Sequence, residues 1–70
     1  MRYVSEVTGK TYRDTESIWV KNPRQAARFI KNGATILDVV VARNTDDLAI
    51  VFDKEETEEM RRLWANYELR

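Results

Sequence analysis

The sequence predicts an α+β domain with two layers, in which two helices, over about residues 23–32 and 54–68, lie on one face of an antiparallel or mixed sheet of about three to five short strands. Two segments carry apolar side chains at helical spacing behind capping residues. Short β-branched runs lie before and between them, separated by turn residues. The composition, 43% hydrophobic and 34% charged over 70 residues, is typical of one small globular domain, so we expect residues 1–70 to form a single unit.

Residues 1–16 are expected to form an N-terminal hairpin, with a frayed segment as the alternative. Tyr3, Val4 and Tyr12 favour strands, and Gly9 suits a tight turn with a positive φ. The run Ser17–Val20 predicts the next short strand.

The first helix is predicted from its two ends. Asn22 is a strong N-cap, Pro23 suits the first helical position, and Gly33 suits the left-handed residue after a helix. Its apolar side is expected to contain Ala26, Ala27, Phe29 and Ile30.

The strongest strand signals are residues 36–42 and 48–52, which are joined by a short turn and should therefore pair antiparallel. We expect one sheet face to receive the helices and to contain Leu37, Val39, Val41, Leu48, Ile50 and Phe52.

The last helix is expected to follow Asp53 as its N-cap, with Glu56 completing a capping box. Its apolar stripe is predicted to consist of Thr57, Met60, Leu63, Trp64 and Tyr67.

The reverse face of the sheet is also predicted to be apolar, where a face in water would be polar. Three alternatives follow for this face. The N-terminal segment covers it through Tyr3, Val4 and Tyr12, or a second copy or another protein covers it. The third is that the face stays exposed, since small apolar residues are common on surfaces. If a partner covers it, the predicted interaction face consists of Trp19, Ile36, Val40 and Val51.

Formal net charge is zero, but residues 1–35 carry seven bases and three acids, and residues 36–70 carry five bases and nine acids. The halves differ in sign, at +4 and −4, which predicts a dipolar surface unless they neutralise each other in the fold. A basic row could contact phosphates, or could simply be a solvated face; it consists of Arg24, Arg28 and Lys31 on the first helix, with Lys21 close by. The zero net charge favours the solvated face.

The sequence contains no His and no Cys, which excludes disulfides, thiolate nucleophiles and the usual general base and zinc ligands. The segment from Gly9 to Thr11 matches the end of a phosphate-binding loop, but Val4 stands where that motif needs glycine. The acidic runs fit turns and the start of a helix. We therefore predict no enzymatic activity, no cofactor and no metal. The lack of a long apolar run or signal segment predicts a cytoplasmic protein without a membrane span.

Most of the chain resembles a family of small uncharacterised proteins from Firmicute bacteria and their prophages. The resemblance is carried by Ile18–Asn22, Gln25-Ala26, Phe29–Gly33, Val51–Asp53, Thr57, Trp64 and Glu68-Leu69. That family has no assigned activity, so the resemblance implies a bacterial setting and transfers no catalytic residue.

The function predicted from these observations is a non-enzymatic protein-interaction module, with homodimerisation through the reverse face or an edge strand as one form of it. The alternative is a small nucleic-acid-binding protein that uses the basic row.

Overall fold

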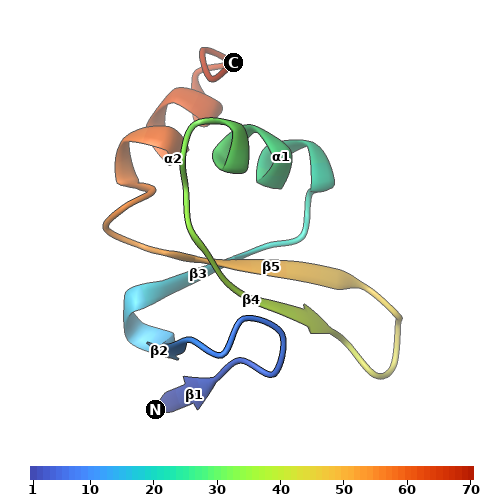
Figure 1. Ribbon diagram of the computed structural model, residues 1–70. Coiled ribbons are helices and arrows are strands. Elements are labelled where there is room, and N and C mark those ends of the chain that lie inside the picture. Colours follow the sequence, from blue (N-terminus) through green and yellow to red (C-terminus); the bar gives the residue numbers. More distant parts are fainter.

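The chain folds into two helices and two small antiparallel sheets, described for all residues 1–70 in a computed structural model (Figure 1). The predicted α+β class is therefore confirmed. The elements follow in the order β1 (Arg2–Val4), β2 (Thr11–Arg13), a short 3-10 turn (Asp14–Glu16), β3 (Ser17–Val20), α1 (Pro23–Lys31), β4 (Ile36–Val41), β5 (Leu48–Asp53) and α2 (Glu58–Ala65).

The main sheet has the order β3-β5-β4, so β5 is the central strand and pairs antiparallel with both neighbours. Ile18 lies opposite Phe52, and Val39 lies opposite Ile50. Because residues opposite each other share a face, Ile18, Phe52 and Ile50 all point to one side. That side carries the helices.

The core lies between this face and the helices. Phe29 of α1 and Phe52 of β5 are fully buried and meet edge to face, with ring centroids 5.5 Å apart. Leu69 closes the core from beyond α2. Met60, Leu63 and Trp64 of α2 pack against the same cluster.

Helix α1 begins and ends nearly as predicted. The Asn22 Oδ1 atom accepts hydrogen bonds from the backbone N–H of Arg24 (3.0 Å) and of Gln25 (3.4 Å). Gly33 follows the helix with a φ of 95°, a conformation that favours glycine. The predicted apolar side was too wide, because Ala27 and Ile30 are exposed while Ala26 and Phe29 are buried.

Helix α2 is shorter than predicted, and the capping box is wrong. The Asp53 carboxylate accepts from the Glu55 N–H (2.9 Å), which closes a turn ahead of the helix. The Glu56 carboxylate instead accepts from the N–H of Thr35 (2.6 Å), in the segment before β4. The helix ends at Ala65, so Tyr67 lies beyond it and is almost entirely exposed rather than part of the stripe.

A β-bulge in β4 overturns the predicted division of faces. Ile36 lies opposite Phe52, but Asp38 lies opposite the adjacent Val51, so Leu37 is an extra residue. The bulge turns Ile36 to the helix side, where it packs against the core. Its predicted place on the reverse face is therefore wrong, and so is the place of Leu37 among the residues facing the helices.

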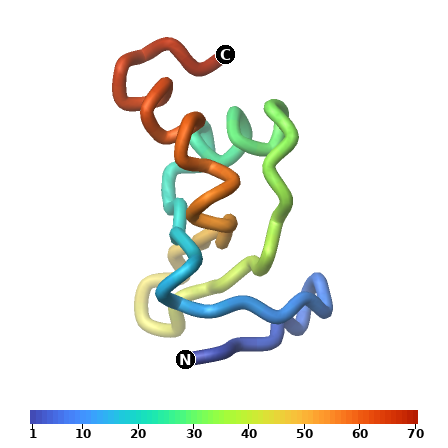
Figure 2. The backbone as a smooth tube through the Cα atoms, turned by 90° about the vertical axis from the view of Figure 1, so that its left-hand side faces the viewer, coloured from blue at the N-terminus to red at the C-terminus, as the bar shows by residue number.

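The β1–β2 hairpin lies on the side of the sheet away from the helices (Figures 1 and 2). Tyr3 pairs with Tyr12, and their rings stack with centroids 5.5 Å apart. Gly9 has a φ of 74° in the connecting loop, as predicted for a tight turn. Residues 1–13 thus form the predicted hairpin rather than a frayed segment.

Candidate interaction surfaces

The structure separates the four residues of the predicted interaction face. Val51 is fully buried, Val40 is half-buried, and Ile36 is turned toward the helices. Trp19, on the edge strand β3, is 50% exposed. Of the predicted face, Trp19 alone presents a large apolar side chain to solvent.

The Asp38 carboxylate attaches the hairpin to the reverse face. Its Oδ1 accepts from the Ser5 hydroxyl (2.6 Å) and from the Val39 N–H (2.8 Å), and its Oδ2 accepts from the Tyr12 hydroxyl (2.5 Å). Ser5, Asp38 and Tyr12 are all buried. Of the three covers considered for this face, the N-terminal segment is the one present, but Tyr12 is the only expected residue that takes part, because Tyr3 and Val4 are exposed.

Burial and hydrogen bonding oppose each other at this carboxylate. Burial pushes the pKa of Asp38 up, but the hydrogen bonds from Ser5, Tyr12 and Val39 together outweigh burial and hold that pKa below its usual value. Burial and the negative charge of Asp38 raise the pKa of the Tyr12 hydroxyl to about 12. Near neutral pH the pair is therefore an ionised carboxylate that accepts a bond from a neutral phenol.

The outer edge of β4 is occupied by side chains. The Ala42 N–H donates to the Asp47 carbonyl, so the backbone groups of the even-numbered residues of this strand point toward β5. The backbone groups of Val39 and Val41 therefore point outward. The Asp38 carboxylate takes up the Val39 N–H, and the Thr8 hydroxyl donates to the Leu37 carbonyl (2.6 Å). The hairpin thus covers part of this edge.

The outer edge of β3 carries no such cover. The Lys54 N–H donates to the Glu16 carbonyl, so the backbone N–H and C=O groups of the even-numbered residues of β3 point toward β5. The backbone N–H and C=O groups of Ser17 and Trp19 consequently point away from the sheet. An open edge of this kind can add a strand from another chain.

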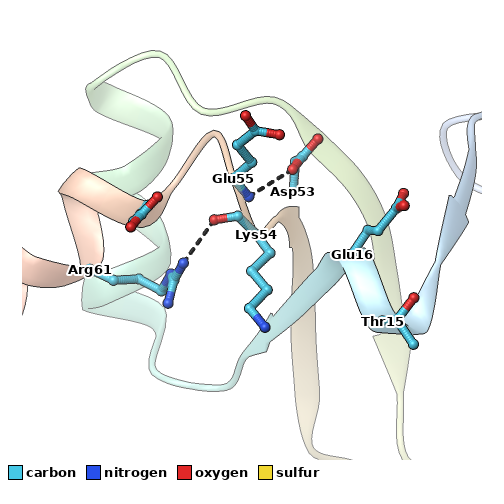
Figure 3. A pocket seen from close by; sticks show the side chains of 7 residues that line it. Thr15, Glu16, Asp53, Lys54, Glu55 and Arg61 are labelled. Carbon is cyan, nitrogen blue, oxygen red and sulfur yellow. Dashed lines mark hydrogen bonds between the residues drawn. The ribbon is translucent and has the colours of Figure 1, made fainter.

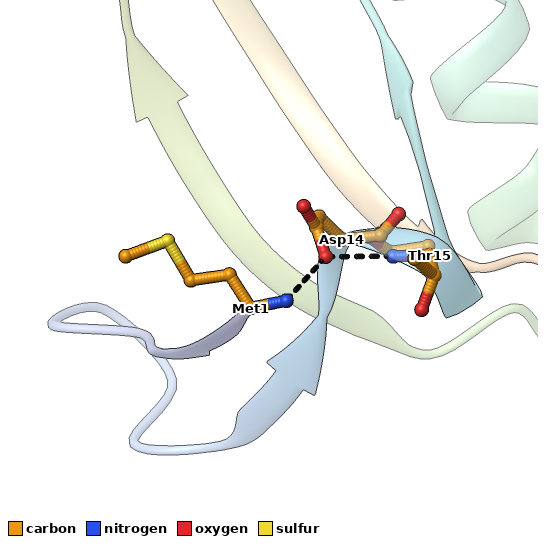
Figure 4. Close-up of polar contacts among 4 residues, drawn as sticks. Met1, Asp14 and Thr15 are labelled. Carbon is orange, nitrogen blue, oxygen red and sulfur yellow. Dashed lines mark hydrogen bonds and ion pairs between the residues drawn. The ribbon is translucent and has the colours of Figure 1, made fainter.

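The two ends of β3 carry opposite charge. Asp14 and Glu16 precede it, and Lys21 and Arg24 follow it. The amino group of Met1 donates to the Asp14 carboxylate (2.9 Å), as does the Thr15 N–H (Figure 4). The hydrogen bond from this amino group lowers the pKa of Asp14.

A polar cleft of about 550 Å³ opens beside the acidic end of β3 (Figure 3). It is lined by Thr15, Glu16, Asp53, Lys54, Glu55, Glu58 and Arg61. The Arg61 guanidinium donates to the Lys54 carbonyl (2.8 Å) across it. No group of three acidic side chains in the chain converges as a metal site. The cleft supplies an acidic environment with two interspersed cations.

The basic row is split by the structure. Lys21, Arg24 and Lys31 are exposed, whereas Arg28 is half-buried and donates through Nη1 to the Leu69 carbonyl (2.7 Å). A second cleft, of about 570 Å³, places Arg24 and Arg28 beside Trp64 and Tyr67. Sequence reasoning missed this grouping, because it assigned Trp64 and Tyr67 to a single buried stripe.

Comparisons with known proteins found no matching family model, no matching curated protein and no matching solved structure. The resemblance to Firmicute and prophage proteins therefore stays a prediction. Neither helix has the length and apolar character needed to cross a membrane.

Proposed function

We propose that this protein is a non-enzymatic interaction module that pairs with a second copy of itself through the outer edge of β3. The observation that carries the proposal is the contrast between the two edges of the sheet. The β4 edge is partly covered by Thr8 and Asp38, while the β3 edge presents unpaired backbone groups beside an exposed tryptophan.

The charges at the ends of β3 favour a second copy as the partner. Antiparallel pairing of two identical strands sets the beginning of one against the end of the other. Asp14 and Glu16 of one copy would then lie near Lys21 and Arg24 of the other, twice in each dimer. Complementary charges set register and orientation more than affinity.

Trp19 supports one particular register. If Trp19 of each copy lies opposite the same residue of the other, both indoles lie on the reverse face and can stack across the interface. Ser17 then lies opposite Lys21, and the outward backbone groups of Trp19 bond in pairs. The result is a continuous antiparallel sheet of both copies, in which the exposed indole area becomes buried.

Analytical ultracentrifugation from micromolar to millimolar concentration tests this proposal. We expect a monomer–dimer equilibrium for the wild type. We expect Trp19→Lys to be monomeric, because a lysine on an edge strand opposes pairing with another chain. Leu48→Lys is the matched control, since Leu48 is also 50% exposed but lies on β5 at the far end of the sheet.

The Leu48→Lys variant should associate like the wild type. A wild type that stays monomeric at millimolar concentration contradicts the proposal. So does a Trp19→Lys variant that still dimerises as strongly as the control.

A further inference from the structure

The cleft between the first turn of α1 and the C-terminal turn of α2 combines cations with aromatic rings. Arg24 and Arg28 lie one helical turn apart on α1, while Trp64 lies in the last turn of α2 and Tyr67 just beyond that helix. The C-terminal segment is held against α1, because the Asn32 side chain donates to the Arg70 carbonyl (2.8 Å) and Leu69 is buried in the core. The cleft walls therefore come from elements that are fastened together.

Tyr67 is unfavourable for stability at its position. The Tyr67 N–H bonds to the Trp64 carbonyl (3.0 Å) and the Glu68 N–H bonds to the Leu63 carbonyl (2.8 Å), which is the helix-ending arrangement that favours glycine. Tyr67 adopts the required left-handed conformation, with a φ of 59°, and leaves 98% of its surface in water. A bulky residue that is strained and makes no core contact points to a role outside folding.

Arg28 is oriented by the protein itself. Its Nη1 atom donates to the Leu69 carbonyl, which holds the guanidinium beside the C-terminal segment, and the group has further N–H donors. The backbone N–H groups of Arg24 and Gln25 bond to the Asn22 side chain, so the two guanidinium groups are the cationic donors that line the cleft. Lys31 at the end of α1 and Lys21 just before the helix add positive charge, and Glu68 is the acidic residue next to Tyr67 in the sequence.

We infer that this cleft binds a nucleotide, with the phosphate on Arg24 and Arg28 and the base stacked on Tyr67. Guanidinium groups pair with phosphate oxygens through two bonds at once, and an exposed aromatic ring stacks with any base. The nucleotide could be free or part of a single strand, since both present the same phosphate and ring. The inference is independent of pairing through β3.

Fluorescence anisotropy with a labelled ten-nucleotide oligouridine at 50 mM salt tests the inference. We expect binding that weakens about 2.6-fold at 200 mM salt for the one phosphate contacted. Tyr67→Gly should weaken binding by at least about fivefold through the loss of stacking, and Tyr67→Phe should retain it. Arg24→Gln should also weaken binding, whereas Lys10→Gln, the same charge change on the distant hairpin, should leave it unchanged.

Competition with AMP separates the two sources of the ligand. Displacement by AMP assigns the cleft to a free nucleotide, and binding without displacement assigns it to a strand; both support the inference. Three results overturn it: no binding at 50 mM salt, unchanged binding by Tyr67→Gly, or equally tight binding of an oligoglutamate peptide of the same length.

Discussion

Replacing Tyr12 with phenylalanine tests how the hairpin is attached to the sheet. The substitution removes one hydroxyl, and with it the 2.5 Å bond to Asp38, while the ring that stacks on Tyr3 stays. A hydrogen bond to a charged group contributes about 1.5–3 kcal/mol. We therefore expect Tyr12→Phe to lower the free energy of unfolding at pH 7 by that amount, which is a large share of the roughly 4–10 kcal/mol typical of a chain this size.

The pH dependence gives a second, independent signature. The pKa of Tyr12 is raised from 10.0 to about 12 in the folded protein, so its contribution is complete below pH 10 and is lost as the pH rises toward 12. The full difference corresponds to about 2.7 kcal/mol, and solvent at the rim of the hairpin reduces it to about 1–2 kcal/mol. With that reduced effect, the wild type should lose about 0.5–0.9 kcal/mol more than Tyr12→Phe between pH 10 and 11.

Urea denaturation followed by tryptophan fluorescence, at pH 7 and in steps from pH 9 to 11, measures both effects. The substitution removes no ionisable group other than Tyr12, so the difference between the curves reports on Tyr12. A variant within about 0.5 kcal/mol of the wild type at pH 7 would refute the attachment. A difference that stays constant up to pH 11 would refute the raised pKa.

Three further substitutions probe the fold. Tyr67→Gly should raise the free energy of unfolding by about 1 kcal/mol, because glycine adopts the left-handed conformation without strain; a lower urea midpoint would contradict this. Phe52→Ala should cost about 3–5 kcal/mol and leave little folded protein by circular dichroism, whereas a cooperative transition near that of the wild type would count against a core centred there. Asp38→Asn should make the free energy of unfolding fall less steeply as the pH is lowered into the acid range. Folding lowers the pKa of Asp38, so the ionised carboxylate stabilises the fold above about pH 4, and this contribution is lost as the pH falls through the folded pKa. If the variant loses as much free energy of unfolding in acid as the wild type, the Asp38 carboxylate is not the group responsible.

Local signals in the sequence located most of the elements. Asn22, Pro23 and Gly33 act through their own backbone and side-chain geometry, so α1 is found at nearly its predicted bounds. Alternation of β-branched residues likewise identified β4 and β5 and their antiparallel pairing. These features depend on neighbours in sequence, which is the information that a single chain displays most directly.

Two of the failures depend on contacts between distant segments. Glu56 fits a capping box by spacing, but Thr35 offers it a donor from another part of the chain. Because of the bulge between Ile36 and Asp38, the Ile36 side chain faces the helices and the Asp38 carboxylate faces the hairpin. Strict alternation would place both side chains on the same face of the strand.

The candidate site was foreseen only in part. The exposure of Trp19 and the edge position of its strand agree with a predicted anchor. The rest of the predicted face is lost, because Val51 is buried, Val40 is half-buried and Ile36 turns toward the helices. The second cleft could have been suspected from one signal. A tyrosine just beyond a helix, at the place usually taken by glycine, is conspicuous once the helix end is known to lie at Ala65.

Because β5 is the central strand, two of its adjacent residues report separately on the two sides of the sheet. Val51 faces the hairpin and Phe52 faces the helices, although they are adjacent in the chain and both fully buried. The methyl resonances of Val51 would report loosening of the hairpin, and the ring resonances of Phe52 would report loosening of the helices. A ligand or partner that disturbed one side alone would thus be recognised from two neighbouring residues in a single spectrum.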